Sequence, residues 1–145
     1  MYFEACILIM NENSEILSVS RKSGEDFGLP SSKVEPGETP IQAAMRGLLE
    51  ETGYKIDDWR LVTIIYHAET DGKLTVAYEA PFDALKQLPL KPTEAAEVRW
   101  LKPHLLAECK NFNEYNCGLF KACGIMIKNE KKKYPWDSSW QPKAG

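Results

Sequence analysis

Residues 27–54 read FGLPSSKVEPGETPIQAAMRGLLEETGY, and this stretch decides the fold because it predicts a loop followed by a helix capped at both ends. Thr39 is a favoured N-cap residue, Pro40 suits the first helical position, and Gln42 completes a Thr-x-x-Gln capping box. Gly53 is a natural stop signal at the carboxyl end. The sequence therefore predicts a helix that begins at Pro40 and ends before Gly53.

The predicted helix has an apolar side and a charged side. The apolar side carries, at helical spacing, Ile41, Ala44, Met45, Leu48, Leu49 and Thr52. A rotation of about 100° per residue places Arg46, Gly47 and Glu50 on the opposite side, while Glu51 lies on the flank beside the apolar stripe. We therefore expect the apolar side to be buried and Gly47 to be exposed.

The charged side has two explanations. Arg46 and Glu50 could form an ordinary i,i+4 surface pair, worth a few tenths of a kcal/mol. The preceding loop favours a second explanation, because it brings Lys33 and another carboxylate, Glu38, close to the start of the helix. Carboxylate and carbonyl oxygens are the ligands that Mg²⁺ and Mn²⁺ prefer. We expect a site for Mg²⁺ or Mn²⁺ beside a diphosphate.

This segment resembles the signature of the Nudix hydrolase superfamily, Gly-x5-Glu-x7-Arg-Glu-U-x-Glu-Glu-x-Gly-U, where U is a bulky apolar residue. Aligned from Ser32, the sequence matches the signature at Glu38, Arg46, Leu48, Glu50, Glu51, Gly53 and Tyr54. The resemblance implies the Nudix fold, an α/β (α+β) fold with a mixed β-sheet between helices. It also implies hydrolysis of a pyrophosphate bond in a nucleoside diphosphate linked to another group, by Mg²⁺-assisted attack of water.

Two positions depart from the signature. Ser32 replaces its glycine; serine keeps the backbone carbonyl that often binds metal in the family, but it loses access to positive φ. Gly47 replaces the first glutamate of Arg-Glu-U-x-Glu-Glu, which usually binds metal or helps to activate water. Gly47 therefore leaves a gap in the acidic side. It keeps open an alternative function, a weak or inactive module that binds a nucleotide or a protein.

The resemblance implies roles for individual residues. The metal ligands are expected among Glu50, Glu51, Ser32 and Glu97, the catalytic residues among Glu50, Glu97 and Arg46, and the substrate contacts among Arg21, Lys33 and Glu38. Each role has an alternative. Glu94 is the reserve for Glu97, which is equally consistent with an exposed edge strand, and Arg21 is consistent with a solvated surface charge. Glu38 and Arg46 could pair mainly to orient the loop.

The composition indicates one ordinary globular domain. The chain has 145 residues, of which 43% are hydrophobic and 27% charged, and we expect the domain at 1–130 and a loosely ordered tail at 131–145. A net charge of −3 argues against general nucleic-acid binding. The start, MYFEACILIM, is too short to span a membrane and is read as a core strand. We expect a cytoplasmic protein with a small nucleotide substrate and no membrane partner; a homodimer stays open.

Outside the signature, periodicity and turn residues predict further elements. The expected strands span about 2–10, 15–20, 60–68, 73–80 and 96–101, and the expected helices span about 103–109 and 114–129. Asp71-Gly72 predicts a tight hairpin turn between the third and fourth of these strands. Strands and helices in this mixed order predict a sheet between helices.

Overall fold

The computed structural model describes residues 2–20, 26–70, 72–87, 97–110 and 112–127. Within these residues, six strands form one mixed sheet with the order β5-β6-β1-β2-β8, and β3 also pairs with β1. These strands are β1 (Tyr2–Met10), β2 (Ile16–Ser20), β3 (Ser31–Lys33), β5 (Val62–Thr70), β6 (Lys73–Pro81) and β8 (Glu97–Leu101). The central pair, β1 and β6, is parallel, and the other pairs are antiparallel.

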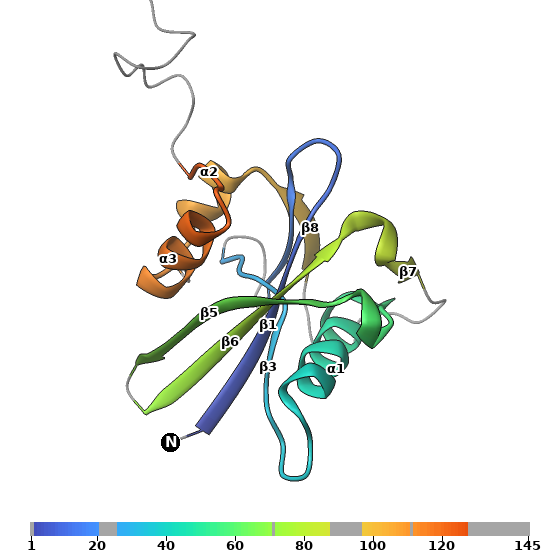
Figure 1. The fold of residues 1–145 in the computed structure, drawn as a ribbon. Helices are drawn as coiled ribbons and strands as arrows, with labels where there is room; N and C mark the ends of the chain where they lie inside the picture. The colour runs from blue at the N-terminus through green and yellow to red at the C-terminus, as the bar shows by residue number, and fades with distance from the viewer. Residues whose placement is uncertain (1, 21–25, 71, 88–96, 111, 128–145) are drawn as a thin grey trace, which may run out of the picture.

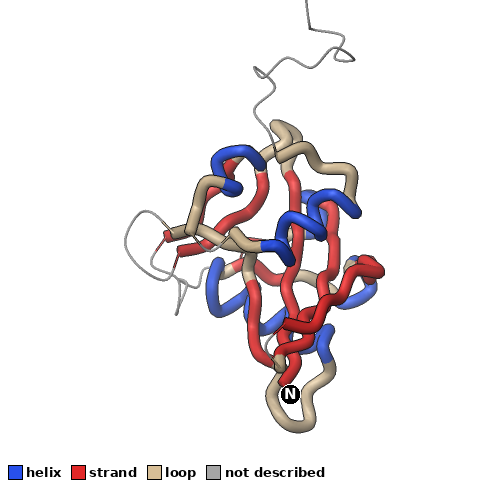
Figure 2. Tube along the Cα trace, turned by 90° about the vertical axis from the view of Figure 1, so that its left-hand side faces the viewer, coloured by secondary structure: helices blue, strands red, loops and turns tan. Residues whose placement is uncertain are grey.

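Helices cover both faces of this sheet (Figure 1). α1 (Pro40–Thr52) lies on one face, and α2 (Pro103–Ala107) and α3 (Glu114–Ala122) lie on the other. The side view in Figure 2 shows strands running between helical segments. Short elements complete the described fold: a second sheet of β4 (Tyr54–Lys55) and β7 (Lys86–Gln87), and the 3₁₀ turns η1 (Asp58–Arg60) and η2 (Phe82–Ala84). The predicted mixed sheet between helices is confirmed.

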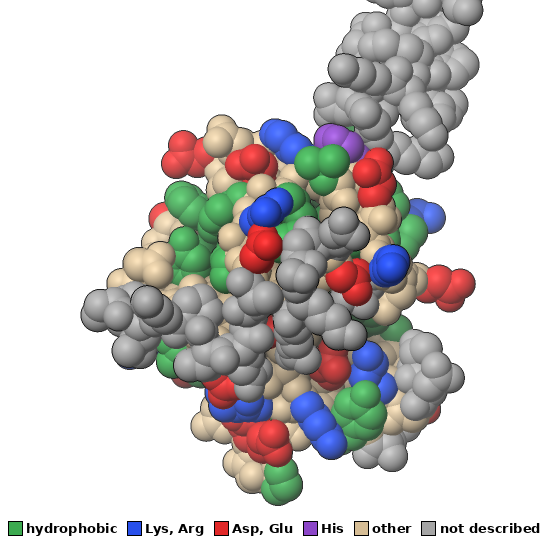
Figure 3. Space-filling model, turned by 180° about the vertical axis from the view of Figure 1, so that it is seen from behind, with side chains coloured by type: hydrophobic (Ala, Val, Ile, Leu, Met, Phe, Trp, Pro, Cys, Tyr) green, Lys and Arg blue, Asp and Glu red, His purple; other side chains and the backbone are tan. Residues whose placement is uncertain are grey.

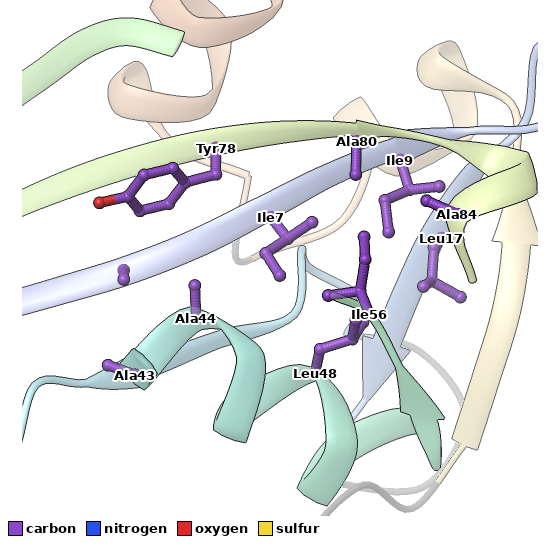
Figure 4. Packing of buried hydrophobic residues seen from close by; sticks show 11 residues of the cluster. Ile7, Ile9, Leu17, Ala43, Ala44, Leu48, Ile56, Tyr78, Ala80 and Ala84 are labelled. Atoms are coloured by element: carbon purple, nitrogen blue, oxygen red, sulfur yellow. The ribbon is translucent and has the colours of Figure 1, made fainter. Parts of the chain in front are cut away.

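Strand β1 supplies both cores because successive side chains point to opposite faces. Ala5, Ile7 and Ile9 form one hydrophobic cluster with Ala44 and Leu48 of α1 (Figure 4). The alternate β1 residues Cys6 and Leu8 pack instead against α2 and α3, through Leu106, Leu119 and Phe120. Burial on both faces explains why the first ten residues read as a nearly continuous apolar run.

The sheet splits beside β1, and this split positions the site. Residues Glu4–Cys6 of β1 pair with β3, whereas Met10 pairs with β2. One isolated bridge, between Val19 and Gly28, connects β2 to the segment before β3. The start of β3 also contacts helix α1, because the Ser31 N–H donates a hydrogen bond to Glu51 of that helix.

The expected strands and helices are present, with shifted ends. The helix predicted at 114–129 ends at Ala122, because Gly124 adopts a left-handed φ of 71° and donates its N–H to Lys121 O. The three-residue β3 and the small second sheet were not predicted. The tail at 131–145 lies outside the described residues. Among the described helices, none is long and apolar enough to cross a membrane.

Candidate functional site

Helix α1 has the predicted caps. Thr39 Oγ1 accepts a hydrogen bond from the Gln42 N–H at 3.2 Å, and Gln42 Oε1 accepts one from the Thr39 N–H at 2.8 Å. At the other end, Gly53 is left-handed with a φ of 77° and donates its N–H to Leu49 O. The caps fix where the helix begins and ends, and so they fix the direction of each charged side chain along it.

Arg46 joins the loop to the helix. Its Nε lies 2.8 Å from Glu38 Oε2, and its Nη2 lies 3.0 Å from Glu38 Oε1 and 2.8 Å from the backbone oxygen of Lys33. Its Nη1 reaches Glu50 Oε1 at 3.3 Å. The hydrogen bond from Arg46 lowers the pKa of Glu38, and the same bond raises the pKa of Arg46, so both groups stay charged. The contacts support a positioning role for this pair.

Glu51 is a buried carboxylate, with only 1% of its surface exposed. Its Oε1 accepts a hydrogen bond from the Ser31 N–H at 2.8 Å, which links the last turn of α1 to the first residue of β3. Glu51 and Ser31 also line a cavity. An acidic side chain of α1 therefore reaches that cavity.

The cavity lies on the face of the sheet that α3 covers. It has a volume of about 730 Å³, within the range of small-molecule binding sites. Its described wall includes Tyr2, Glu4 and Cys6 of β1, Lys73 and Thr75 of β6, and residues 113–116 at the start of α3. Lys73 Nζ lies 3.8 Å from Glu4 Oε2. Burial raises the pKa of the Cys6 thiol to about 12, so this thiol stays protonated and is not a nucleophile.

Gly47 is buried, so the prediction of an exposed gap is wrong. A Cβ atom added to Gly47 would lie 2.7 Å from the Cβ of Ser32 and 3.2 Å from the backbone oxygen of Ser31. β3 packs across this side of α1 and covers it. The rotation of 100° per residue could not predict this burial. It shows which side of a helix is polar, but it does not show which neighbouring segment packs over that side. Ser32 itself has ordinary extended backbone, so the replacement of glycine causes no backbone strain at this position.

The remaining candidates lie elsewhere or outside the described residues. Glu97 begins β8, pairs with Ser20 of β2, and forms an ion pair of 2.7 Å with Arg99. It is not among the described residues that line the cavity, and its role stays a prediction. Lys33 extends its amine over the ring of Tyr2, 4.9 Å from the ring centre. Arg21 and Glu94 lie outside the described residues.

A divalent metal is compatible with the oxygen donors around α1. Within the described part of the chain, no group of three or more His, Cys, Asp or Glu side chains is arranged as a metal site. Mg²⁺ does not require such a group, because it usually keeps several waters and binds one or two carboxylates together with substrate phosphates. Glu51 lines the cavity and supplies one such carboxylate, and its sequence neighbour Glu50, which contacts Arg46, is the next carboxylate along α1. The donor set fits a metal that is held jointly with a phosphate ligand.

Sequence reasoning missed most of the cavity wall. Tyr2, Glu4 and Cys6 alternate along β1, so a period of two could have placed them on one face. No local signal joins them to Tyr115 and Asn116, which arrive from the far end of the chain with α3.

On the face drawn in Figure 3, the described acidic and basic side chains are interspersed, and neither sign forms a patch of its own.

Comparisons with known proteins show what this chain is similar to. The NUDIX domain family model matches residues 3–120. An RNA pyrophosphohydrolase from Mannheimia succiniciproducens is 28% identical over 136 residues, which cover 94% of this chain and 61% of that protein. The "Putative 8-oxo-dGTP diphosphatase" of Bacillus subtilis is 46% identical over 50 residues, 34% of each protein. This chain thus spans between 34% and 61% of the length of these two relatives.

A solved structure shows the same fold. The NUDIX hydrolase from Nitrosomonas europaea has a TM-score of 0.65 with this chain at 19% identity, and the match covers 92% of this chain and 96% of that one. At this identity the likeness supports the arrangement of the sheet and helices alone.

Proposed function

Because the chain belongs to the Nudix superfamily, we propose that it hydrolyses a pyrophosphate bond in a nucleoside diphosphate linked to another group, by metal-assisted attack of water. One observation carries the proposal. The buried carboxylate of Glu51, on the signature helix, lines a cavity of about 730 Å³, which is large enough for a nucleotide. Glu51 therefore extends from α1, on one face of the sheet, to the cavity on the other face.

We assign the metal to Glu50 and Glu51, with the substrate phosphates completing its ligands. When bound, Mg²⁺ or Mn²⁺ would neutralise phosphate charge and activate water. The Ser31 N–H orients Glu51 through its hydrogen bond. Arg46 and Glu38 hold the loop against the helix. These contacts give the site a fixed shape before the substrate arrives.

The other roles predicted from the sequence also belong to this proposal. Glu97 would act as a further metal ligand or as the general base, and the backbone at Ser32 as an oxygen donor. Lys33 and Arg21 would contact phosphate. The partner is a small nucleotide substrate.

The cavity also supports an orientation of the substrate. Its one described lysine, Lys73, is already near Glu4, and the other described charged residues that line it, Asp26, Glu51 and Glu114, are acidic. Such a wall repels bare phosphates. We therefore place the uncharged nucleoside against the start of α3 and the phosphates beside Glu51, where the metal neutralises them.

The test is hydrolysis by the purified protein with Mg²⁺ or Mn²⁺. The panel should include 8-oxo-dGTP, unmodified nucleoside triphosphates, nucleoside diphosphate derivatives and an RNA oligonucleotide with a 5′-triphosphate, with released phosphate and pyrophosphate as the readout. Glu51→Gln should abolish turnover. Glu12→Gln, an exposed change in the turn between β1 and β2, should leave it unchanged.

The second candidate function is a binding module without turnover, and Gly47 favours it by removing a signature carboxylate. Calorimetric binding of a nucleotide, with no product after prolonged incubation with either metal, would support this module. It would contradict the proposed hydrolysis.

A further inference from the structure

We propose that Ser32 and Gly47 form a matched packing pair, in which the serine on β3 fills the space that any side chain at position 47 would occupy. A carboxylate can then return to position 47 of the helix only if Ser32 becomes glycine. Ser32 is a positioning residue in this arrangement, because it sets how closely β3 lies against α1.

The contact distances carry the first step. A Cβ at Gly47 would lie 2.7 Å from the Cβ of Ser32, well inside the closest approach of two saturated carbons. The Cβ of Ser32 is attached directly to the backbone, so it cannot rotate away as the end of a long side chain could. Relief requires movement of β3 or of α1.

The two departures from the family signature are therefore one exchange. The signature has glycine at position 32 and glutamate at position 47, and this chain has a side chain at 32 and none at 47. Each residue makes room for the other across the same contact. A single reversal at position 47 creates a clash, whereas a single reversal at position 32 leaves unfilled space.

Movement of β3 would also disturb the cavity. The Ser31 N–H donates to Glu51 at 2.8 Å, and Ser31 O would itself lie 3.2 Å from a Cβ at position 47. Displacing β3 outward lengthens the hydrogen bond that orients Glu51. We therefore expect Gly47→Glu alone to weaken metal binding, although it adds a carboxylate. This metal argument rests on the proposed function, and the packing argument does not.

The packing pair is tested by a double-mutant cycle in urea. Gly47→Ala introduces only the Cβ and should lower the unfolding midpoint in the wild-type background. In the Ser32→Gly background the same change should lower the midpoint clearly less, because the 2.7 Å contact is gone and only the Ser31 oxygen and carbon, at 3.2 and 3.3 Å, remain close. Gly28→Ala is the matched control, since a Cβ there meets nothing within 4 Å; combined with Ser32→Gly, it should give additive shifts. Additive shifts for Gly47→Ala would overturn the pair.

The carboxylate is tested by Mn²⁺ titration of the same folded proteins, without substrate. Ser32→Gly combined with Gly47→Glu should bind Mn²⁺ about tenfold more tightly than the wild type, because affinity rises with the number of charged ligands, and Gly47→Glu alone should bind it more weakly. Equal affinities in the double variant and the wild type would overturn the claim that removing the Ser32 side chain lets a carboxylate at position 47 take part in metal binding. Failure of the proposed function would appear separately, as no turnover by the wild type, and the urea cycle would be unaffected.

Discussion

Arg46 and Glu38 lie eight residues apart, yet their side chains make two parallel contacts of 2.8 and 3.0 Å. The fork geometry of a guanidinium matches both oxygens of one carboxylate. The same guanidinium also contacts the Lys33 oxygen and Glu50. One side chain therefore holds the loop, the start of the helix and a candidate metal ligand together.

The first prediction concerns the shape of this arginine. Arg46→Lys keeps the charge but cannot reproduce the fork, so we expect the free energy of unfolding to fall by about 1–2 kcal/mol. Urea denaturation measures this change. The matched control is Arg60→Lys, because Arg60 pairs with an exposed Asp83; a surface pair should change stability by less than about 1 kcal/mol. Equal losses in the two variants would contradict a special role for Arg46.

The second prediction is the pH dependence of stability. The pKa of Glu38 is lowered from its ordinary value of 4.5, mainly by the hydrogen bond from Arg46. A lowered folded-state pKa adds stability above the unfolded pKa, and this contribution is lost as the pH falls through the lower, folded value. Glu38→Gln should therefore cost stability at pH 7 and less at pH 3, which lies below the ordinary pKa of 4.5.

Urea midpoints of Glu38→Gln and the wild type, measured between pH 3 and pH 7, check the second prediction. Glu12→Gln, in an exposed turn, is the control and should follow the wild type throughout. A constant difference between Glu38→Gln and the wild type would show that the carboxylate charge is not responsible.

Particular residues show how far the sequence predicts this molecule. Thr39, Gln42 and Gly53 give the ends of α1 because capping depends on neighbours a few residues away. The burial of Gly47 depends on β3, which is three residues long and too short to show an alternating pattern. The cavity depends on Tyr115, which tertiary packing alone brings to β1. Local chemistry is thus predictable here, and contacts between distant segments are not.

The third prediction concerns the cysteines. Cys6 is 4% exposed and its pKa is raised to about 12 by burial, whereas Cys117 is exposed. Thiolates are the reactive form, so N-ethylmaleimide at pH 7.5 should modify the exposed Cys117 rapidly and Cys6 slowly, because the buried Cys6 thiol stays protonated. Peptide mass spectrometry over time measures both rates. Rapid labelling of Cys6 in a Cys117→Ser variant would contradict the burial and the raised pKa of this thiol.

The fourth prediction separates two roles of Glu51. Glu51→Gln removes the charge but keeps an oxygen that accepts the Ser31 hydrogen bond, whereas Glu51→Ala removes the acceptor as well. We expect both variants to lose turnover. Only Glu51→Ala should lose about 1–3 kcal/mol of stability, because a buried hydrogen bond then disappears.

Urea unfolding and hydrolysis assays on the same preparations check the fourth prediction. Glu12→Gln is the control for both measurements and should match the wild type. If Glu51→Gln kept full turnover, the charge at position 51 would not be needed, and the metal would have to be assigned to other oxygens. If Glu51→Gln were as unstable as Glu51→Ala, its loss of turnover would report misfolding, and the assignment would then depend on Mn²⁺ affinity alone.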